Sequence, residues 1–135
     1  MKYLLDTNVL SEPVQPRPNP QVVRRIARHQ REVATASIVW HELLHGTARL
    51  PASARRTLLE DYLAGVGHRT PILPYDEAAA AWHAKERARL FQRTPPFRDG
   101  LIAAVAAVHG LTLVTANTKD FAMYQGLSVE DWGRP

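Results

Sequence analysis

Apolar residues along the chain fall into short runs that alternate with longer stretches of helical spacing. The first run covers residues 3–5, contains no turn residue and is long enough for a buried strand. It stops at Asp6, after which Thr7 and Asn8 supply polar groups suited to a helix N-cap. Asp6 either caps that turn or, as a charge leaving a buried strand, requires a partner or a metal ion.

Prolines and polar capping residues indicate where the later elements begin. The four prolines within residues 13–20 predict a loop or a short broken helix, at the end of which Asn19 suits the N-cap and Pro20 the first helical position. Ser37 and Asp76 are expected to cap two further helices. The predicted helices cover about residues 19–31, 37–48, 51–67, 77–91 and 99–108, and the predicted strands cover residues 3–5, 33–35, 72–73, 111–115 and part of 126–132.

Strands and helices alternate along the whole sequence. Alternation of this kind favours a parallel sheet covered by helices. The chain has 135 residues, of which 45% are hydrophobic and 22% charged, values that are ordinary for one globular domain. No repeat or linker interrupts the order. We therefore expect residues 1–135 to form a single domain, an α/β/α sandwich with a central, mainly parallel sheet.

The composition limits the chemistry that the chain can perform. It has no cysteine, which excludes disulfides and thiolate metal sites, so a metal ion would have oxygen or histidine ligands. No apolar stretch approaches the roughly 18 residues of a membrane span, and no signal-peptide pattern is present, so we expect a cytoplasmic protein without a membrane partner. The net charge of +4 suits a polyanionic partner such as nucleic acid, although a basic surface is also common among soluble proteins.

Three acidic residues occupy equivalent places in the predicted fold. Asp6, Glu42 and Asp99 each follow a strand or lie in the opening turns of a helix, and such places converge on one edge of a parallel sheet. For Glu42 alone, the spacing favours a purely structural role near a helix N-terminus. Three neighbouring carboxylates repel one another unless a divalent cation neutralises them, and all-oxygen ligation favours Mg²⁺ or Mn²⁺.

Four segments give the chain a more specific pattern. In order they are YLLDTNVLSE, IVWHELLHG, PFRDGLIAAVAAVHGLTLVTANTKDF and GLSVEDW. Together with their spacing and the chain length, they resemble the PIN-domain ribonucleases, in particular the VapC-type toxins of bacterial toxin–antitoxin pairs. The resemblance implies a PIN-like fold and a Mg²⁺-dependent endoribonuclease that cleaves single-stranded or looped RNA with a metal-activated water.

The resemblance also implies roles for individual residues. The first three acids of the family fall on Asp6, Glu42 and Asp99, of which the two aspartates are expected to bind the metal directly and Glu42 directly or through water. Where many members carry a fourth acid this sequence has Asn117, whose amide can orient a water through hydrogen bonds. Asp120, three residues further on, is an alternative fourth group that acts directly or through water.

Polar and basic neighbours are expected to support these acids. The hydroxyl groups of Thr7, Ser37 and Thr115 are candidates for orienting the carboxylates, although capping and strand positions explain them equally well. Arg98, beside Asp99, and Lys119 are candidates for contacting RNA phosphates.

Three other functions compete with the nuclease. The segment His41-Glu42-Leu43-Leu44-His45 spells HExxH, the motif of zinc metalloproteases, but a zinc hydrolase would leave Asp6 and Asp99 unexplained. A haloacid-dehalogenase-like phosphatase requires a second Asp where this chain has Asn8. A PIN-like scaffold that binds RNA or a partner without cutting is compatible with the missing fourth acid.

The resemblance finally implies partners. VapC-type toxins form homodimers and are inhibited by a cognate VapB-type antitoxin, which inserts an arginine or another side chain near the acids. A basic side chain is attracted to an acidic cluster, so the expected partners are RNA, an antitoxin and a second copy of the chain.

Overall fold

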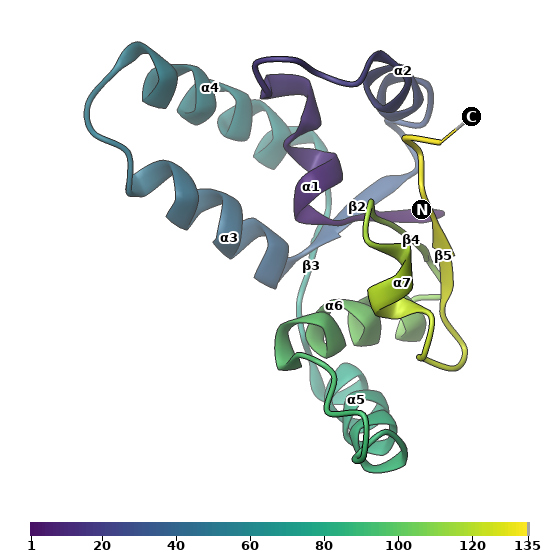
Figure 1. The fold of residues 1–135 in the computed structure, drawn as a ribbon. Helices are drawn as coiled ribbons and strands as arrows, with labels where there is room; N and C mark the ends of the chain where they lie inside the picture. The colour runs from purple at the N-terminus through teal and green to yellow at the C-terminus, as the bar shows by residue number, and fades with distance from the viewer. Residues whose placement is uncertain (135) are drawn as a thin grey trace.

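The computed structural model describes residues 1–134 and contains five short strands that are separated by helices (Figure 1). In chain order the elements are β1 (Tyr3–Leu5), α1 (Thr7–Leu10), the 3₁₀ helix η1 (Glu12–Val14), α2 (Pro20–Arg28), β2 (Val33–Ala36), α3 (Ser37–Ala48), α4 (Ala54–Arg69), β3 (Ile72–Leu73), α5 (Glu77–Arg89), α6 (Phe97–Val108), β4 (Thr112–Val114), α7 (Thr118–Phe121) and β5 (Ser128–Glu130).

The strands form one parallel sheet with the order β3-β2-β1-β4-β5. Strand β1 lies at its centre, where Leu4 pairs with Ala34 of β2 on one side and with Leu113 of β4 on the other. Because all five strands run the same way, their carboxyl ends share one edge of the sheet. This topology confirms the predicted α/β fold with a central parallel sheet.

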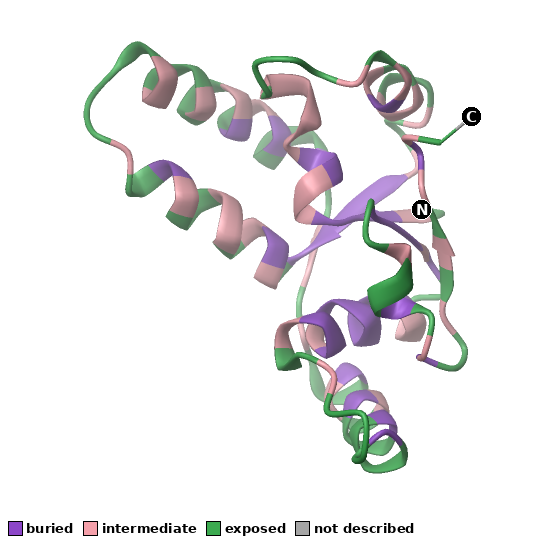
Figure 2. Cartoon of the chain, in the orientation of Figure 1, coloured by how far each residue is buried: buried purple, intermediate pink, exposed green. Residues whose placement is uncertain are grey.

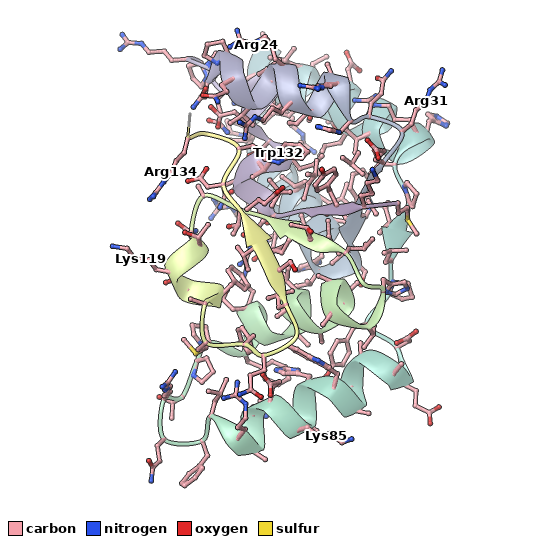
Figure 3. The ribbon with its side chains drawn as sticks, turned by 90° about the vertical axis from the view of Figure 1, so that its right-hand side faces the viewer. Arg24, Arg31, Lys85, Lys119, Trp132 and Arg134 are labelled. Carbon is pink, nitrogen blue, oxygen red and sulfur yellow. The ribbon has the colours of Figure 1, made fainter. Side chains whose placement is uncertain are left out.

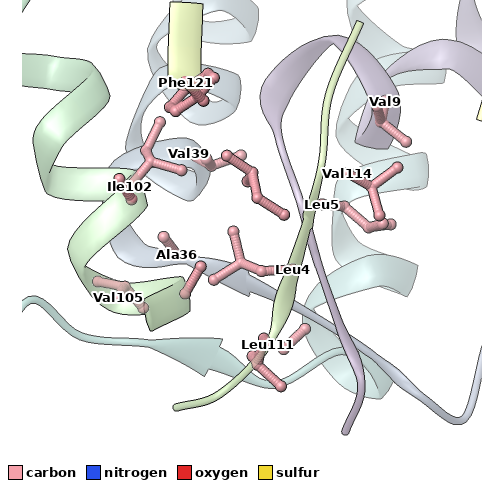
Figure 4. Packing of buried hydrophobic residues seen from close by; sticks show 14 of the residues in the cluster. Leu4, Leu5, Val9, Ala36, Val39, Ile102, Val105, Leu111, Val114 and Phe121 are labelled. Carbon is pink, nitrogen blue, oxygen red and sulfur yellow. The ribbon is translucent and has the colours of Figure 1, made fainter. Parts of the chain in front are cut away.

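Helices cover the two faces of the sheet. In the view of Figure 1, α5 and α6 lie below the sheet and α1, α2 and α4 above it, while α3 and α4 form a hairpin that extends from one side. Figure 2 shows buried residues concentrated in β1, β2, β4 and α6. The close view in Figure 4 places Leu4 of β1 near Ile102 and Val105 of α6, so the core forms where the central strand meets this apolar helix. None of the helices in residues 1–134 combines the length and apolar character needed to cross a bilayer.

The caps of α2 and α5 confirm two sequence predictions, and the start of α3 corrects a third. Asn19 accepts a hydrogen bond from the Gln21 N–H (2.9 Å), and Asp76 accepts one from the Ala79 N–H (3.0 Å). The expected cap of α3 was wrong, because Ala36 is the N-cap and Ser37 is already helical. The reason is that β2 continues through the fully buried Ala36, so the extended backbone persists one residue longer than predicted.

A buried carboxylate fixes the chain after α7. Glu86 of α5 accepts two hydrogen bonds from Arg89 (both 2.8 Å) and one from the Gln125 N–H (2.8 Å). Arg89 in turn donates to the Met123 carbonyl (2.7 Å). These bonds hold the pKa of Glu86 below its ordinary value of 4.5, the Arg89 bond being the main cause. The ion pair thus ties the segment after α7 to α5 and limits where α7 can lie.

Helices α5 and α6 approach closely at Gly100, one residue after Asp99. A Cβ atom on Gly100 would overlap the imidazole of His83, a buried residue whose Nδ1 is 3.0 Å from the Tyr75 hydroxyl. The missing side chain therefore sets the spacing between the helix that carries Asp99 and its neighbour.

We expect Gly100→Ala to lower the free energy of unfolding by about 1–3 kcal/mol, because the added methyl group has no space. Gly46→Ala is the matched control: nothing lies within 4 Å of the added Cβ, so better helix propensity should stabilise the protein by about 0.5–1 kcal/mol. Urea unfolding measures both effects. A His83→Ala background should reduce the cost of Gly100→Ala, and an equal cost in both backgrounds would contradict the proposed clash.

Candidate active site

Asp6 is a fully buried carboxylate at the carboxyl end of the central strand. Its Oδ1 accepts a hydrogen bond from the Thr7 N–H (2.8 Å), and its Oδ2 accepts one from the Thr115 hydroxyl (2.8 Å). The first bond makes Asp6 the N-cap of α1. The second reaches across to the end of the neighbouring strand β4. Asp6 therefore both caps the turn and has partners for its buried charge, so the two roles considered from the sequence coexist.

Glu42 reaches the same place from α3. Its Oε1 accepts a hydrogen bond from the Thr7 hydroxyl (2.7 Å), which links α3 to the residue that follows Asp6. Thr7 belongs to α1, so three elements meet at this point. The contact shows that Glu42 is part of the acidic cluster and is not confined to a role in its own helix.

Asp99 lies in the first turn of α6, where the positive end of the helix dipole favours an acid. The rigid Pro95-Pro96 pair precedes the helix and Pro96 is its N-cap. Asp99 is buried, and its Oδ1 accepts a hydrogen bond from Arg98 Nη1 (3.0 Å).

The guanidinium of Arg98 joins all three acids. Nε and Nη2 donate to the two carboxylate oxygens of Glu42 (2.8 Å each), Nη2 also donates to Asp6 Oδ1 (2.9 Å), and Nη1 donates to Asp99. A further contact joins Nη2 to the Thr7 hydroxyl oxygen (3.1 Å). Carboxylates from the end of β1, from α3 and from α6 thus converge on one cation, as the topology predicts.

The electrostatics of the cluster differ from acid to acid. The hydrogen bonds from Arg98 hold the pKa of Glu42 below its ordinary value of 4.5, with burial opposing the shift. Burial raises the pKa of Asp99 above its ordinary value of 3.8, and the charges of Asp120 and Asp6 add to this effect while Arg98 opposes it. Glu42 therefore adds stability above its ordinary pKa, and that stability is lost as the pH falls. The raised pKa of Asp99 has the opposite effect on the pH dependence of stability. Its contribution to stability is present at low pH and is lost as the pH rises through the raised pKa.

The remaining candidate residues differ in how close they lie to the acids. The hydroxyl groups of Thr7 and Thr115 contact carboxylates, as described above. Asn117 follows β4, and its N–H donates to the Thr115 hydroxyl (3.1 Å), so its backbone is linked to Asp6 through one side chain. Asp120 is close enough for its charge to raise the pKa of Asp99. Lys119 is exposed on α7.

Ser37 does not belong to the cluster. It opens α3 and is exposed, with no hydrogen bond to an acid among the described residues. Five residues of α-helix turn the chain through about 140° beyond one full rotation, so Ser37 and Glu42 project from different sides of α3. The structure therefore does not bring Ser37 to the carboxylates that it was expected to orient.

Two polar residues near the cluster were missed by the sequence analysis. The buried Thr35 of β2 donates to the Leu5 carbonyl (2.9 Å), beside Asp6. Asn8 accepts a hydrogen bond from the Ala116 N–H (3.1 Å) and so joins α1 to the loop after β4. The sequence offered one signal for each of these residues. For Thr35 it was a polar residue within the otherwise apolar run VATA, and for Asn8 it was an amide two residues after Asp6.

The donor set suits a hard divalent cation, but the side chains are not arranged as ligands of one ion. The cluster offers carboxylate oxygens, which Mg²⁺ and Mn²⁺ prefer. The Arg98 guanidinium, itself a cation, is in contact with three of these carboxylates. As they stand within residues 1–134, no three Asp, Glu or His side chains are grouped closely enough to hold a metal ion.

The histidines of the HExxH segment form no hydrogen bond with the acids of the cluster among the described residues. The rings of His41 and His45 stack parallel with their centroids 6.0 Å apart, and both residues are exposed. Glu42 is engaged by Thr7 and Arg98 instead. No third His, Asp or Glu is grouped with these histidines closely enough to hold a metal ion in the part of the chain that the structure describes.

The fold and the cluster define a class: an α/β protein with an acidic site at the carboxyl edge of its central parallel strands. The model of the PIN domain family matches residues 3–127, and the chain belongs to this family. The haloacid-dehalogenase-like and zinc-hydrolase alternatives are therefore wrong.

Similar proteins that align with nearly the full length of the chain also support its membership of this family. The chain is 31% identical to the tRNA(fMet)-specific endonuclease VapC of Shigella flexneri over 134 residues, which cover 98% of each chain. It is 36% identical to toxin FitB of Neisseria gonorrhoeae over 129 residues, 87% of this chain and 89% of that one. The solved structure of FitAB bound to the IR36 DNA fragment matches with a TM-score of 0.86 and 30% identity, covering 98% of this chain and 96% of the other.

We expect Thr115→Val to lower the free energy of unfolding by about 1.5–3 kcal/mol, because it removes a hydrogen bond to the buried, charged Asp6. Thr115→Ser keeps the hydroxyl and should cost only about 1 kcal/mol for the lost methyl group. Urea unfolding at neutral pH compares the two. A loss for Thr115→Val no larger than that for Thr115→Ser would contradict the role of the hydroxyl.

Proposed function

We propose that this protein is a divalent-metal-dependent endoribonuclease toxin that cleaves single-stranded or looped RNA. The observation that carries the proposal is the convergence of Asp6, Glu42 and Asp99 on one position from three separate elements. Family membership and full-length relatives named as VapC ribonucleases support it. The proposal treats residues 1–135 as one functional domain.

Asp6, Asp99 and Glu42 are the residues that would hold the metal ion, Mg²⁺ or Mn²⁺. When bound, the ion supplies Lewis acidity, which makes a hydroxide nucleophile available at neutral pH and offsets charge on the phosphate. The chain has already ordered the ligand oxygens of Asp6, since Thr7 and Thr115 each hold one of them. Ligands fixed in this way lose little conformational entropy on metal binding.

Asn117 and Asp120 are proposed to act at the edge of the site. Asn117 is anchored through its N–H to Thr115, and its amide would orient the attacking water by hydrogen bonding. Asp120 lies within electrostatic range of Asp99 and would act directly or through water. Thr7 and Thr115 are proposed as positioning residues that fix the carboxylates and do not touch the substrate.

Basic residues around the acidic centre are proposed to bind the RNA backbone. The chain carries a net charge of +4, and Figure 3 shows Lys119 projecting from α7, Arg24 on α2 and Arg31 in the turn between α2 and β2. Lys119 follows Asn117 by two residues, so it lies next to the proposed site. The guanidinium of Arg98 is engaged by the three acids, so its expected phosphate contact requires a different side-chain position.

The protein is further proposed to act in the bacterial cytoplasm as a homodimer that a cognate VapB-type antitoxin neutralises. Similar solved structures include FitAB bound to an IR36 DNA fragment and a toxin-antitoxin complex from Klebsiella pneumoniae. An inhibitor that presents a basic side chain would find three carboxylates at the site, which gives the inhibition an electrostatic basis. A PIN-like scaffold that binds RNA without cutting it is the alternative that the following experiment separates.

We expect the purified protein with Mg²⁺ or Mn²⁺ to cleave RNA, and Asp99→Asn to lower the rate at least about 100-fold. The metal's charge stabilisation is worth several kcal/mol, and 1.36 kcal/mol corresponds to tenfold in rate. Cleavage mapping on total RNA is the measurement, and circular dichroism verifies folding. Asp61→Asn, at an exposed position on α4, is the control and should cleave normally. Undiminished cleavage by Asp99→Asn would contradict the assigned site, and absence of cleavage by the wild type would favour the scaffold.

RNA affinity should fall with salt, and Lys119→Gln should make the logarithmic salt slope shallower by about 0.7, the value for one phosphate contact with a single strand. Fluorescence anisotropy with single-stranded RNA in an Asp99→Asn background measures binding without cleavage. Lys85→Gln on α5 is the control, and its slope should match that of the Asp99→Asn parent. A salt-independent affinity would contradict electrostatic binding of the backbone.

A further inference from the structure

Arg98 occupies an unfavourable position in its own helix. It lies in the first turn of α6, where the helix dipole disfavours a cation. Long-range contacts compensate, because the guanidinium donates to Glu42 and Asp6, residues 56 and 92 positions away in sequence. The position of this side chain is therefore determined by the carboxylates and not by helix preference.

The contacts of Arg98 use four of the six carboxylate oxygens that the three acids offer to a metal ion. Asp6 Oδ1, Asp99 Oδ1 and both oxygens of Glu42 each accept a hydrogen bond from the guanidinium. The closest contacts are 2.8 Å, whereas Mg²⁺ requires oxygens at about 2.0–2.1 Å. An ion at ligand distance from these oxygens and the guanidinium in its present place would overlap.

The guanidinium cannot release the acids by losing its proton, because arginine stays charged in proteins. It can release them by moving. The side chains of Arg98 and Glu42 are 34% and 31% exposed. Those of Asp6 and Asp99 are only 0% and 10% exposed, so Arg98 lies on the solvent side of the two aspartates, level with Glu42. Its departure would therefore not require the core to repack.

We propose that Arg98 is a latch on the acidic site: its guanidinium holds Asp6, Glu42 and Asp99 together in the metal-free protein, and divalent metal binding displaces it. Latched and metal-bound states are mutually exclusive. The displaced side chain lies at the rim of the site, where it is available to a phosphate. This inference rests on the proposed function, because both concern the same carboxylates.

Metal affinity tests the latch without measuring cleavage. Isothermal titration with Mn²⁺ alone should show Arg98→Gln binding about 10-fold or more tightly than wild type, because no charge-assisted hydrogen bonds need to break first. Loss of a positive charge alone would also tighten binding, so Arg98→Lys is the decisive variant. Lysine keeps the charge but lacks the planar fork that spans several carboxylates. It should bind Mn²⁺ at least about 3-fold more tightly than wild type, since fewer of these bonds remain.

Arg93→Gln is the matched control, since it removes an exposed positive charge from the segment leading to α6. Its Mn²⁺ affinity should stay within about twofold of wild type, because exposed charges are screened. Arg98→Lys binding like wild type would overturn the latch.

The wild-type protein provides a test that needs no folded variant. The Arg98 Nε–H resonance in ¹⁵N NMR spectra should shift and exchange faster with solvent when Mg²⁺ saturates the site, because its bond to Glu42 is broken. A resonance that keeps its shift and slow exchange at saturating Mg²⁺ would overturn the proposal. Asp99→Asn separates the two hypotheses. If wild type binds metal and Asp99→Asn does not, an unchanged Arg98 refutes the latch alone. If no form of the protein binds metal, the metal site and the latch both fail.

Discussion

The buried carboxylate of Asp6 is the constraint on which the rest of the site depends. An ionised group with no exposed surface is costly unless it is paired and hydrogen-bonded. Thr7, Thr115 and Arg98 provide these bonds from the start of α1, the end of β4 and the start of α6. The need to satisfy one charge thus brings together segments more than 90 residues apart, and it does so at the end of the central strand.

The cluster also shows how a functional site works against stability. Burial raises the pKa of Asp99, so its ionised form at neutral pH is held at a cost to the folded state. The hydrogen bond and positive charge of Arg98 oppose the rise in the pKa of Asp99, and they lower the pKa of Glu42. Nearby, the burial of Tyr124 itself, together with the charges of Asp99 and Glu86, raises the pKa of this tyrosine to about 12. The net charge of the three acids and Arg98 remains negative, which is the state that attracts a further cation.

Much of this arrangement followed from sequence, and the reasons are local. The apolar run that stops at Asp6, the Asn19-Pro20 start of α2 and the Asp76 cap depend on neighbouring residues, and each was predicted correctly. The convergence of Asp6 and Asp99 followed from topology, since parallel strands share one carboxyl edge. Ser37 was misjudged because the end of β2 is set by burial in the sheet, which short-range capping preferences do not encode.

The contacts of Arg98 lay beyond the sequence analysis for a different reason. Its sequence neighbour Asp99 suggested a residue beside the site, facing RNA, whereas its guanidinium contacts acids from three elements. A long side chain can reach many places, and the choice depends on where the unpaired charges lie once β1, α3 and α6 have assembled. A guanidinium suits that position because its five donors lie in one plane and can serve several carboxylates at once. The physical need for a cation follows from the three acids alone, and the folded chain meets that need with one of its own residues.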